Sequence, residues 1–272
     1  MNGFSRALMM GALGLANAGA NGDGDLFNVT LDYTAASRYV THGFDVGGNN
    51  FSHQPWIAVT CSELPGFTLQ YWTSLSMDRD KKFADEWDLM LIYNRTFCPD
   101  DPWALAFNGY VTYWGYPNIT KDTDRHGNPI RNPKDFQGWK FNTGLSLPNR
   151  IILPNDQALV PGWNFFYWTP SADDQFKSGG VHEFYLKTSL PLPLPDGKGI
   201  PQSIGLMSTV NYHTGFLNID SGWSHATATI STSAPLNDSF TWHSSINYQW
   251  SFEDTVNPDD EFWATLGLRA SF

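Results

Sequence analysis

The strongest constraint on this fold is a strict alternation of apolar and polar residues at the C-terminus. The chain ends FWATLGLRASF. One set of alternate residues is Phe262, Ala264, Leu266, Leu268, Ala270 and Phe272, and the other is Trp263, Thr265, Gly267, Arg269 and Ser271. Because successive side chains of a β-strand point to opposite faces of the sheet, this segment is predicted to be a strand with one apolar and one mostly polar face.

The same alternation recurs along most of the chain, interrupted by clusters of Pro, Gly, Asn and Asp. Strands are predicted at 26–35, 54–62, 67–77, 86–97, 103–115, 136–147, 162–169, 180–190, 203–213, 223–233, 239–250 and 262–272. Most have about the 9–11 residues that a tilted strand needs to cross a bilayer, and their number is even, as in bacterial outer-membrane barrels. The predicted fold is therefore all-β, an antiparallel up-and-down transmembrane β-barrel of about 12 strands.

Composition narrows the class of protein. Charged residues make up 16% of the chain, against about 25% in typical soluble domains. The net charge of −11 argues against a nucleic-acid partner, which needs clustered Lys and Arg. No stretch approaches eighteen consecutive apolar residues, so no transmembrane helix is predicted.

The N-terminus has the pattern of a secretory signal peptide. Arg6 precedes an apolar run from Ala7 to Ala16, and small residues follow up to Ala20. We therefore expect residues 1–20 to be a signal peptide and residues 21–272 to form the outer-membrane barrel of a Gram-negative bacterium.

The connections between the predicted strands suggest an orientation. With the mature N-terminus in the periplasm, the external connections are 36–53, 78–85, 116–135, 170–179, 214–222 and 251–261. Three of the five periplasmic connections are short, as is usual in such barrels. The connections at 148–161 and 191–202 are long and break this rule.

The polar faces of the strands are predicted to line the lumen. The candidate pore-lining residues are Asp32, Gln70, Trp72, Asp88, Asn108, Tyr110, Lys140, Asn142, Glu183, Lys187, Asn211, His225, His243, Asn247 and Arg269. Most are neutral hydrogen-bonding groups or aromatics, and both signs of charge occur. Such a wall suits small polar solutes, whereas a ring of one sign would favour ion selectivity. The alternative is that these side chains fill the interior of a non-conducting structural or adhesive barrel.

Cys61 and Cys98 are the two cysteines. They close two strands that are separated by one strand, at the periplasmic end. An exported chain with an even number of cysteines permits one disulfide, and two free thiols are the alternative.

Three features of the sequence have catalytic or metal-binding potential: a His, Ser and Asn on one strand, a short acidic segment, and the scattered histidines. His243, Ser245 and Asn247 share one strand face, but no acidic partner is close in sequence, so no enzyme activity is expected. The segment from Asp122 to Asn128 resembles the start of a calcium loop but has Pro133 at the position that requires a bidentate Glu. The histidines lack metal-ligand spacing, so neither metal nor cofactor is predicted.

The segment NVTLDYTAASRYVTHGFDVGGNNFSHQPWIAV resembles the start of the TorF-type outer-membrane porins of proteobacteria, through the element from Ser37 to Gly43. The terminal strand ending in Phe272 resembles the signal that outer-membrane barrels present to the barrel-assembly machinery. The resemblance implies a barrel with a transport role. Together with the polar lumen face, it leads us to expect a porin-like channel for passive diffusion of small polar solutes in the bacterial outer membrane. Lipid and lipopolysaccharide would surround it, and it could form a homo-oligomer. A secreted carbohydrate-binding β-sandwich is the alternative from another class.

Overall fold

The computed structural model describes residues 26–48, 50–77, 85–117, 137–154, 157–171, 177–192 and 202–272. The predicted signal peptide at residues 1–20 and the segment from Asp122 to Asn128 lie outside these ranges. None of the described residues forms a helix that is long and apolar enough to cross a membrane.

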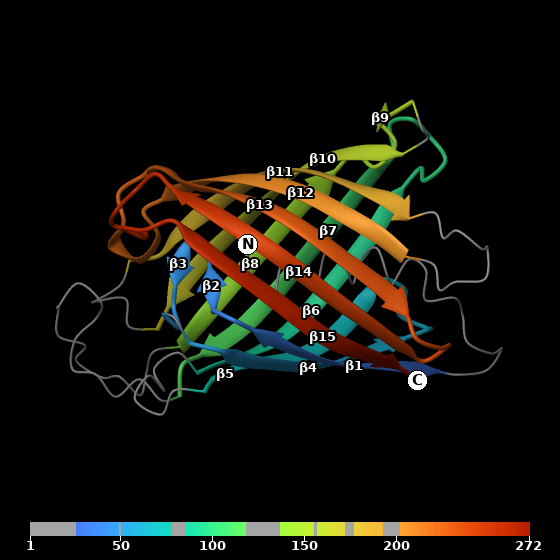
Figure 1. Cartoon of the computed structure of the whole chain (residues 1–272), viewed down its shortest axis with the longest axis horizontal. Coiled ribbons are helices and arrows are strands. Elements are labelled where there is room, and N and C mark those ends of the chain that lie inside the picture. The colour runs from blue at the N-terminus through green and yellow to red at the C-terminus, as the bar shows by residue number, and fades with distance from the viewer. Residues whose placement is uncertain are drawn as a thin grey trace.

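Twelve long antiparallel strands form one closed sheet (Figure 1). They are β1 (Phe27–Ala36), β4 (Ser52–Cys61), β5 (Phe67–Ser76), β6 (Glu86–Phe97), β7 (Leu105–Gly115), β8 (Gln137–Ser146), β10 (Ala158–Pro170), β11 (Gly179–Leu192), β12 (Gln202–Thr214), β13 (Gly222–Pro235), β14 (Phe240–Ser251) and β15 (Glu261–Ser271). Neighbours in the sequence pair in space, and the first strand pairs with the last from Thr30–Ser271 to Ala36–Thr265. The predicted barrel is confirmed, and the β-sandwich is wrong because the seam between β1 and β15 closes the sheet.

The described residues also form four short elements. The strands β2 (Val40–Thr41) and β3 (Phe44–Asp45) form a small hairpin between β1 and β4, outside the main sheet. The strand β9 (Ile151–Ile152) pairs with the start of β10 in the long connection after β8. A single 3-10 turn, η3 (Phe216–Asn218), follows β12.

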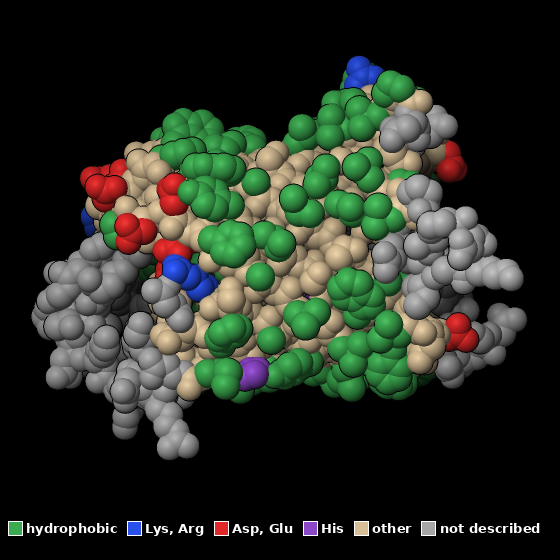
Figure 2. All heavy atoms as spheres, in the orientation of Figure 1, with side chains coloured by type: hydrophobic (Ala, Val, Ile, Leu, Met, Phe, Trp, Pro, Cys, Tyr) green, Lys and Arg blue, Asp and Glu red, His purple; other side chains and the backbone are tan. Residues whose placement is uncertain are grey.

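Apolar side chains cover the outside of the barrel, whereas the inside holds the polar side chains together with a cluster of buried aromatics that includes Trp72 and Trp168. On β14, Ile246 is 54% exposed and its neighbour Asn247 is 1% exposed. On β15, Leu266 is 60% exposed, whereas Trp263 is 1% exposed. Figure 2 shows the apolar side chains spread over the wall of the barrel, with the visible acidic groups at its two ends, mostly at the left one. An exposed apolar surface of this extent is the surface of a protein that meets lipid rather than water.

Aromatic rings contact one another near both ends of the outer wall. At one end, Trp87, Tyr113 and Trp139 form a chain across β6, β7 and β8, with ring centroids 5.4 and 4.9 Å apart. At the other end, the ring centroids of Tyr93 and Phe67 lie 4.7 Å apart. Leucines such as Leu89 and Leu91 occupy the wall between these groups on β6. Two aromatic belts around an aliphatic band match the two interfaces of a bilayer.

Both cysteines lie at the same end of the barrel, as predicted. Cys61 ends β4, and Cys98 follows β6 in a turn with a positive φ of 49°. Both are free thiols in the structure, so the disulfide permitted by the sequence is not formed.

Candidate functional site

The connection between β1 and β4 turns into the barrel, and we call its residues 37–48 the plug segment. Residues 36–53 are predicted from the sequence to be an external connection, and the structure shows that residues 37–48 of this connection fold into the lumen. Tyr39, Val40 and Phe44 are buried. Side chains of the plug segment contact β5, β6, β10, β12 and β15, and the backbone carbonyl of Gly43 contacts β14. These strands are distributed around the whole circumference, so the segment crosses the lumen.

A tight turn at His42 and Gly43 forms the tip of the plug segment. Both residues have positive φ, 48° and 93°, as the two central residues of a type I′ hairpin turn require. A Cβ on Gly43 would lie 2.5 Å from His225 Nδ1 and 2.7 Å from a methyl group of Val256. The tip therefore fits closely against β13 and against the connection that follows β14.

Aromatic rings on the lumen wall surround the tip. The His42 ring lies 4.8 Å from Phe166 on β10 and 5.8 Å from Phe216 in η3. The centroid of the Phe44 ring lies 5.9 Å from that of Phe216 and 5.9 Å from that of His213. Burial lowers the pKa of His42 well below its ordinary value, and the nearby Lys140 and His213 act in the same direction. His42 is consequently neutral in the seated plug segment.

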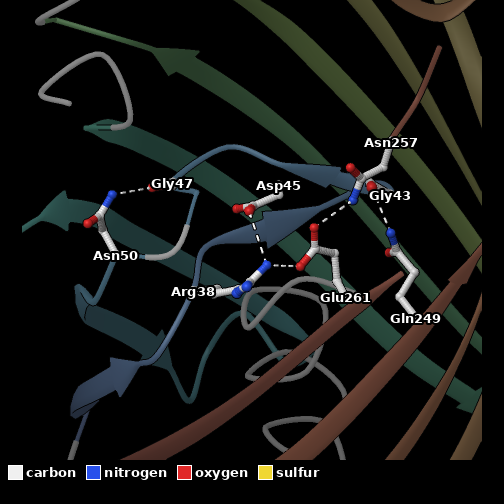
Figure 3. A network of polar contacts seen from close by, with 8 residues as sticks. All are labelled: Arg38, Gly43, Asp45, Gly47, Asn50, Gln249, Asn257 and Glu261. Carbon is white, nitrogen blue, oxygen red and sulfur yellow. Dashed lines mark hydrogen bonds and ion pairs between the residues drawn. The ribbon is translucent and has the colours of Figure 1, made fainter. Parts of the chain in front are cut away.

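Polar contacts fix both sides of the plug segment (Figure 3). The Arg38 guanidinium pairs with Glu261 at the start of β15, and with Asp45 of the plug segment itself at 3.5 Å. Asn257 donates to the other Glu261 oxygen at 3.1 Å. Gln249 Nε2 donates to the Gly43 carbonyl at 2.8 Å, as Figure 3 shows. The segment is thus held by directed bonds in addition to apolar contact.

A third anchor lies across the lumen at the start of β6. The hydroxyls of Tyr39 and Tyr116 both donate to Glu86 Oε2, the second at 2.7 Å. Burial raises the pKa of both tyrosines, and the Glu86 carboxylate adds to the rise. Both phenols therefore remain protonated donors, and they satisfy a carboxylate that would otherwise be costly to bury.

The structure places all the predicted pore-lining residues on strands of the barrel, in register with the inward faces. Buried ones are Asp32, Gln70, Trp72, Asp88, Tyr110, Lys140, Asn142, Glu183, Asn211, His225, His243 and Asn247, and half-buried ones are Asn108, Lys187 and Arg269. Their placement is an observation, whereas their role in passing a solute remains a proposal.

The fold brings some of these residues into contact and keeps others apart. Lys140 lies 3.6 Å from Asp88, and Asn164 donates to Glu183 at 2.8 Å. Asp32 accepts from both His243 and Arg269. His243 thus has an acidic partner that is 211 positions away in sequence, which no local pattern could reveal.

His243, Ser245 and Asn247 on β14 do not form the Ser–His–acid hydrogen-bond chain of a catalytic triad. The hydroxyl of Ser245 bonds to Thr265 at 2.7 Å and accepts from Asn247 at 3.1 Å. His243 instead bonds to Asp32 at 2.9 Å. Among the described residues, no group of three or more His, Cys, Asp or Glu is arranged to hold a metal ion.

Sequence reasoning missed the plug segment and its anchors at Arg38, Gly43, Gln249 and Glu261. A signal was present: Tyr39, Val40 and Phe44 are apolar residues in a connection that should be polar, and they flank a His-Gly pair. Large apolar residues on both sides of a turn dipeptide indicate a hairpin that buries its side chains.

No protein-family model matches the sequence, and no curated protein matches it. Solved structures show likeness in fold. The NanC porin is 8% identical, with a TM-score of 0.52, covering 88% of this chain and 98% of its own. The KdgM porin is 7% identical, with a TM-score of 0.49, covering 89% and 99%. An outer membrane channel from Pseudomonas putida F1 is 11% identical, with a TM-score of 0.49, covering 93% and 100%. At these identities, the likeness to NanC shows the barrel fold alone.

Proposed function

We propose that this protein is a porin-like channel of the bacterial outer membrane through which small polar solutes diffuse passively, and that the plug segment forms its constriction. One observation carries the proposal. The closed barrel has an apolar outer wall and an inner face that is polar on β12 to β15, and an internal segment anchored by directed bonds crosses its lumen. Water and polar solutes need such an inner face, since unpaired polar groups in an apolar passage are costly.

The inner face is divided into two unlike walls. Strands β12 to β15 present small hydroxyl and amide groups: Thr209, Asn211, Thr227, Thr229, Ser231, Ser245, Asn247 and Thr265. Strands β4 to β7 present Trp56, Trp72, Met90 and Tyr110. A solute with hydroxyl groups and an apolar face could contact both walls at once.

A non-conducting structural or adhesive barrel is the second candidate. It is favoured by the contacts that the plug segment makes around the whole circumference, because such contacts can fill the lumen. The surrounding partners we propose are the same in both cases, namely lipid, lipopolysaccharide and the assembly machinery. Homo-oligomer formation and the closer assignment to TorF-type porins remain predictions.

Planar-bilayer recordings with the full chain test the proposal. We expect conductance steps from folded protein, and larger steps when residues 40–45 are replaced by a Gly-Ser segment of equal length. The matched control replaces residues 149–154, at the opposite end of the barrel, in the same way and should leave the steps unchanged. Steps seen only after removal of 40–45 would support the non-conducting barrel, and no steps from either protein would refute the channel.

A further inference from the structure

A second polar cluster lies away from the plug segment, on three neighbouring strands. Arg269 of β15 is paired in register with Asp32 of β1, and Asp32 is paired with Trp56 of β4. Arg269 Nε donates to Asp32 Oδ2 at 3.2 Å, and the centre of the guanidinium lies 5.3 Å from the centre of the Trp56 ring. The arginine side chain therefore reaches across β1 and rests on the indole.

The orientation of this arginine is fixed by its neighbours. The Asp32 oxygens are already occupied: Oδ2 also accepts from His243 at 2.9 Å, and Oδ1 accepts from Thr34 at 2.8 Å. On the intervening strand β15, Gly267 is paired with His243 on one side and with Thr34 on the other, and a Cβ there would collide with the His243 ring and lie 2.8 Å from Thr34 Oγ1. A glycine at this position thus allows the histidine to reach across β15 to the aspartate.

Two sets of donors remain without acceptors at this cluster. Within the ranges that the structure describes, the terminal nitrogens of Arg269 make no hydrogen bond, because its one polar contact uses Nε. The indole Nε1 of Trp56 is buried and has no acceptor among the same residues. A buried donor without an acceptor, such as the Trp56 indole N–H, is uncommon in folded proteins and calls for an explanation, whereas the half-buried Arg269 terminus is reached from the lumen. An arginine whose Nε is occupied can still hold a carboxylate end-on through its two terminal nitrogens.

Charges in the lumen are divided along the barrel axis. Glu86, Asp88, Glu261 and Asp45 lie near the plug end and are only partly offset by Lys140 and Arg38. Arg269 lies near the opposite end of β15, where Asp32 is its partner. Lys187 also lies toward that opposite end, on β11, and its ammonium sits over the Tyr185 ring, with no carboxylate partner among the described residues. The end of the lumen away from the plug segment is therefore the more basic one, and an anion would be drawn there.

We propose that Arg269 and Trp56 form a binding subsite for a small organic carboxylate inside the lumen. The guanidinium terminus binds the carboxylate end-on and the indole N–H adds a third donor. Asp32 holds the arginine in place and lowers the positive charge of the cluster, which favours a singly charged carboxylate over a doubly charged phosphate. The hydroxyls of Ser231 and Ser233 on β13 lie near this level of the lumen and suit a hydroxyl on the same solute.

This inference rests on the proposed channel function for solute access, so binding is measured separately from conductance. Saturation-transfer NMR on the full chain in detergent uses L-lactate as the carboxylate probe and propane-1,2-diol as the neutral probe of similar size. Inorganic phosphate has no carbon-bound proton to observe, so it is added as a dianionic competitor and its binding is measured by its displacement of lactate. We expect a saturable signal for lactate only. A protein that binds lactate but shows no conductance would refute the channel and keep the subsite.

Variants separate a defined subsite from a general positive field. Arg269→Lys keeps the positive charge but loses the two parallel N–H donors of the planar guanidinium. It should weaken lactate binding about tenfold, since a charge-assisted hydrogen bond contributes on that order. Trp56→Phe should weaken binding severalfold. Arg95→Gln, on the outer wall, is the matched control and should bind lactate like the wild type.

The proposal requires that Arg269→Lys weakens lactate binding more than Lys187→Gln does, and the reverse result would overturn it. If Lys187→Gln weakens binding and Arg269→Lys does not, the lumen attracts anions without a defined subsite. Stronger binding of phosphate than of lactate would overturn the carboxylate assignment, and an absence of saturable lactate signal would overturn the subsite. A heat-dependent mobility shift on SDS gels shows that each variant is folded before it is compared.

Discussion

At the residue scale, single glycines and histidines decide whether the plug segment can sit in the lumen. His42 and Gly43 supply the two positive φ angles of the tip, and Gly43 also leaves the space that His225 and Val256 occupy. Neither effect depends on the amount of apolar surface that is buried. Both depend on the absence of one Cβ at one position, so small substitutions there should have large effects.

Gly43→Ala should release the plug segment. An alanine at this φ costs about 1–2 kcal/mol, and the contacts with His225 and Val256 add about 1–3 kcal/mol of overpacking. The expected result is a larger single-channel conductance with an unchanged barrel. Gly222→Ala is the matched control, because a Cβ there meets nothing within 4 Å. Equal conductance of the two variants and the wild type would contradict the seating described above.

Acid should loosen the plug segment through His42. Its pKa is lowered when seated but is about 6.5 when released, so the released form takes up the proton preferentially. Stabilisation of the seated form is therefore complete above about pH 6.5 and decreases as the pH falls below this value. We expect conductance to rise between about pH 7 and about pH 5.

His42→Asn separates this effect from other titrations in the lumen. Asparagine tolerates the positive φ of the turn and does not titrate. The variant should lose most of the rise in conductance at low pH. A pH profile identical to that of the wild type would assign the effect to titratable groups other than His42.

At the scale of elements, the hairpin of β2 and β3 is too short to be stable alone. It has two residues in each strand, and isolated hairpins are marginal in water even when they are longer. Its conformation is therefore imposed by the barrel, through Glu261, Gln249 and the aromatic rings of β10 and η3. The strands of the barrel, in contrast, support one another through continuous ladders.

Arg38→Gln should weaken the hold on this hairpin. The change removes a charged partner of Glu261, which is buried, and costs about 1–3 kcal/mol because a charge-assisted bond is lost. We expect faster limited proteolysis within residues 37–48 at an unchanged barrel stability. Arg150→Gln is the control, since Arg150 stacks on Trp103 at the opposite end. Equal cleavage rates in the two variants would show that the ion pair does not hold the segment.

At the scale of the whole molecule, closure of the sheet removes its two free edges. The seam includes the terminal residue: Phe272 N donates to Val29 O at 2.9 Å, and Val29 N donates to Phe272 O at 3.0 Å. All backbone groups of the long strands can then pair within the barrel, which is the condition for crossing lipid with strands. The Phe272 side chain itself is 58% exposed and so remains available to a partner.

Phe272→Ala should separate assembly in cells from stability. The backbone bonds of the seam do not need the side chain, so protein refolded in detergent should keep the heat-dependent mobility shift of the wild type. In cells, the amount of shifted protein in the outer membrane should fall if the assembly machinery reads the terminal aromatic. Phe252→Ala, also an exposed aromatic, is the control. Equal amounts of the two variants in the membrane would refute the role of Phe272 as a signal.

The sequence by itself determined the barrel, because the information is local. Alternation places Ile246 outside and Asn247 inside whatever the neighbouring strand is, and the strand at 86–97 was predicted with the bounds that the structure shows. Only the tertiary structure decided where the connection after β1 would lie and which polar residues would meet. Arg38 and Glu261 are separated by 223 positions, and Asp32 and His243 by 211. Such pairs depend on closure of the sheet, which sets strands from the two ends of the chain side by side and encloses a lumen into which a connection can fold.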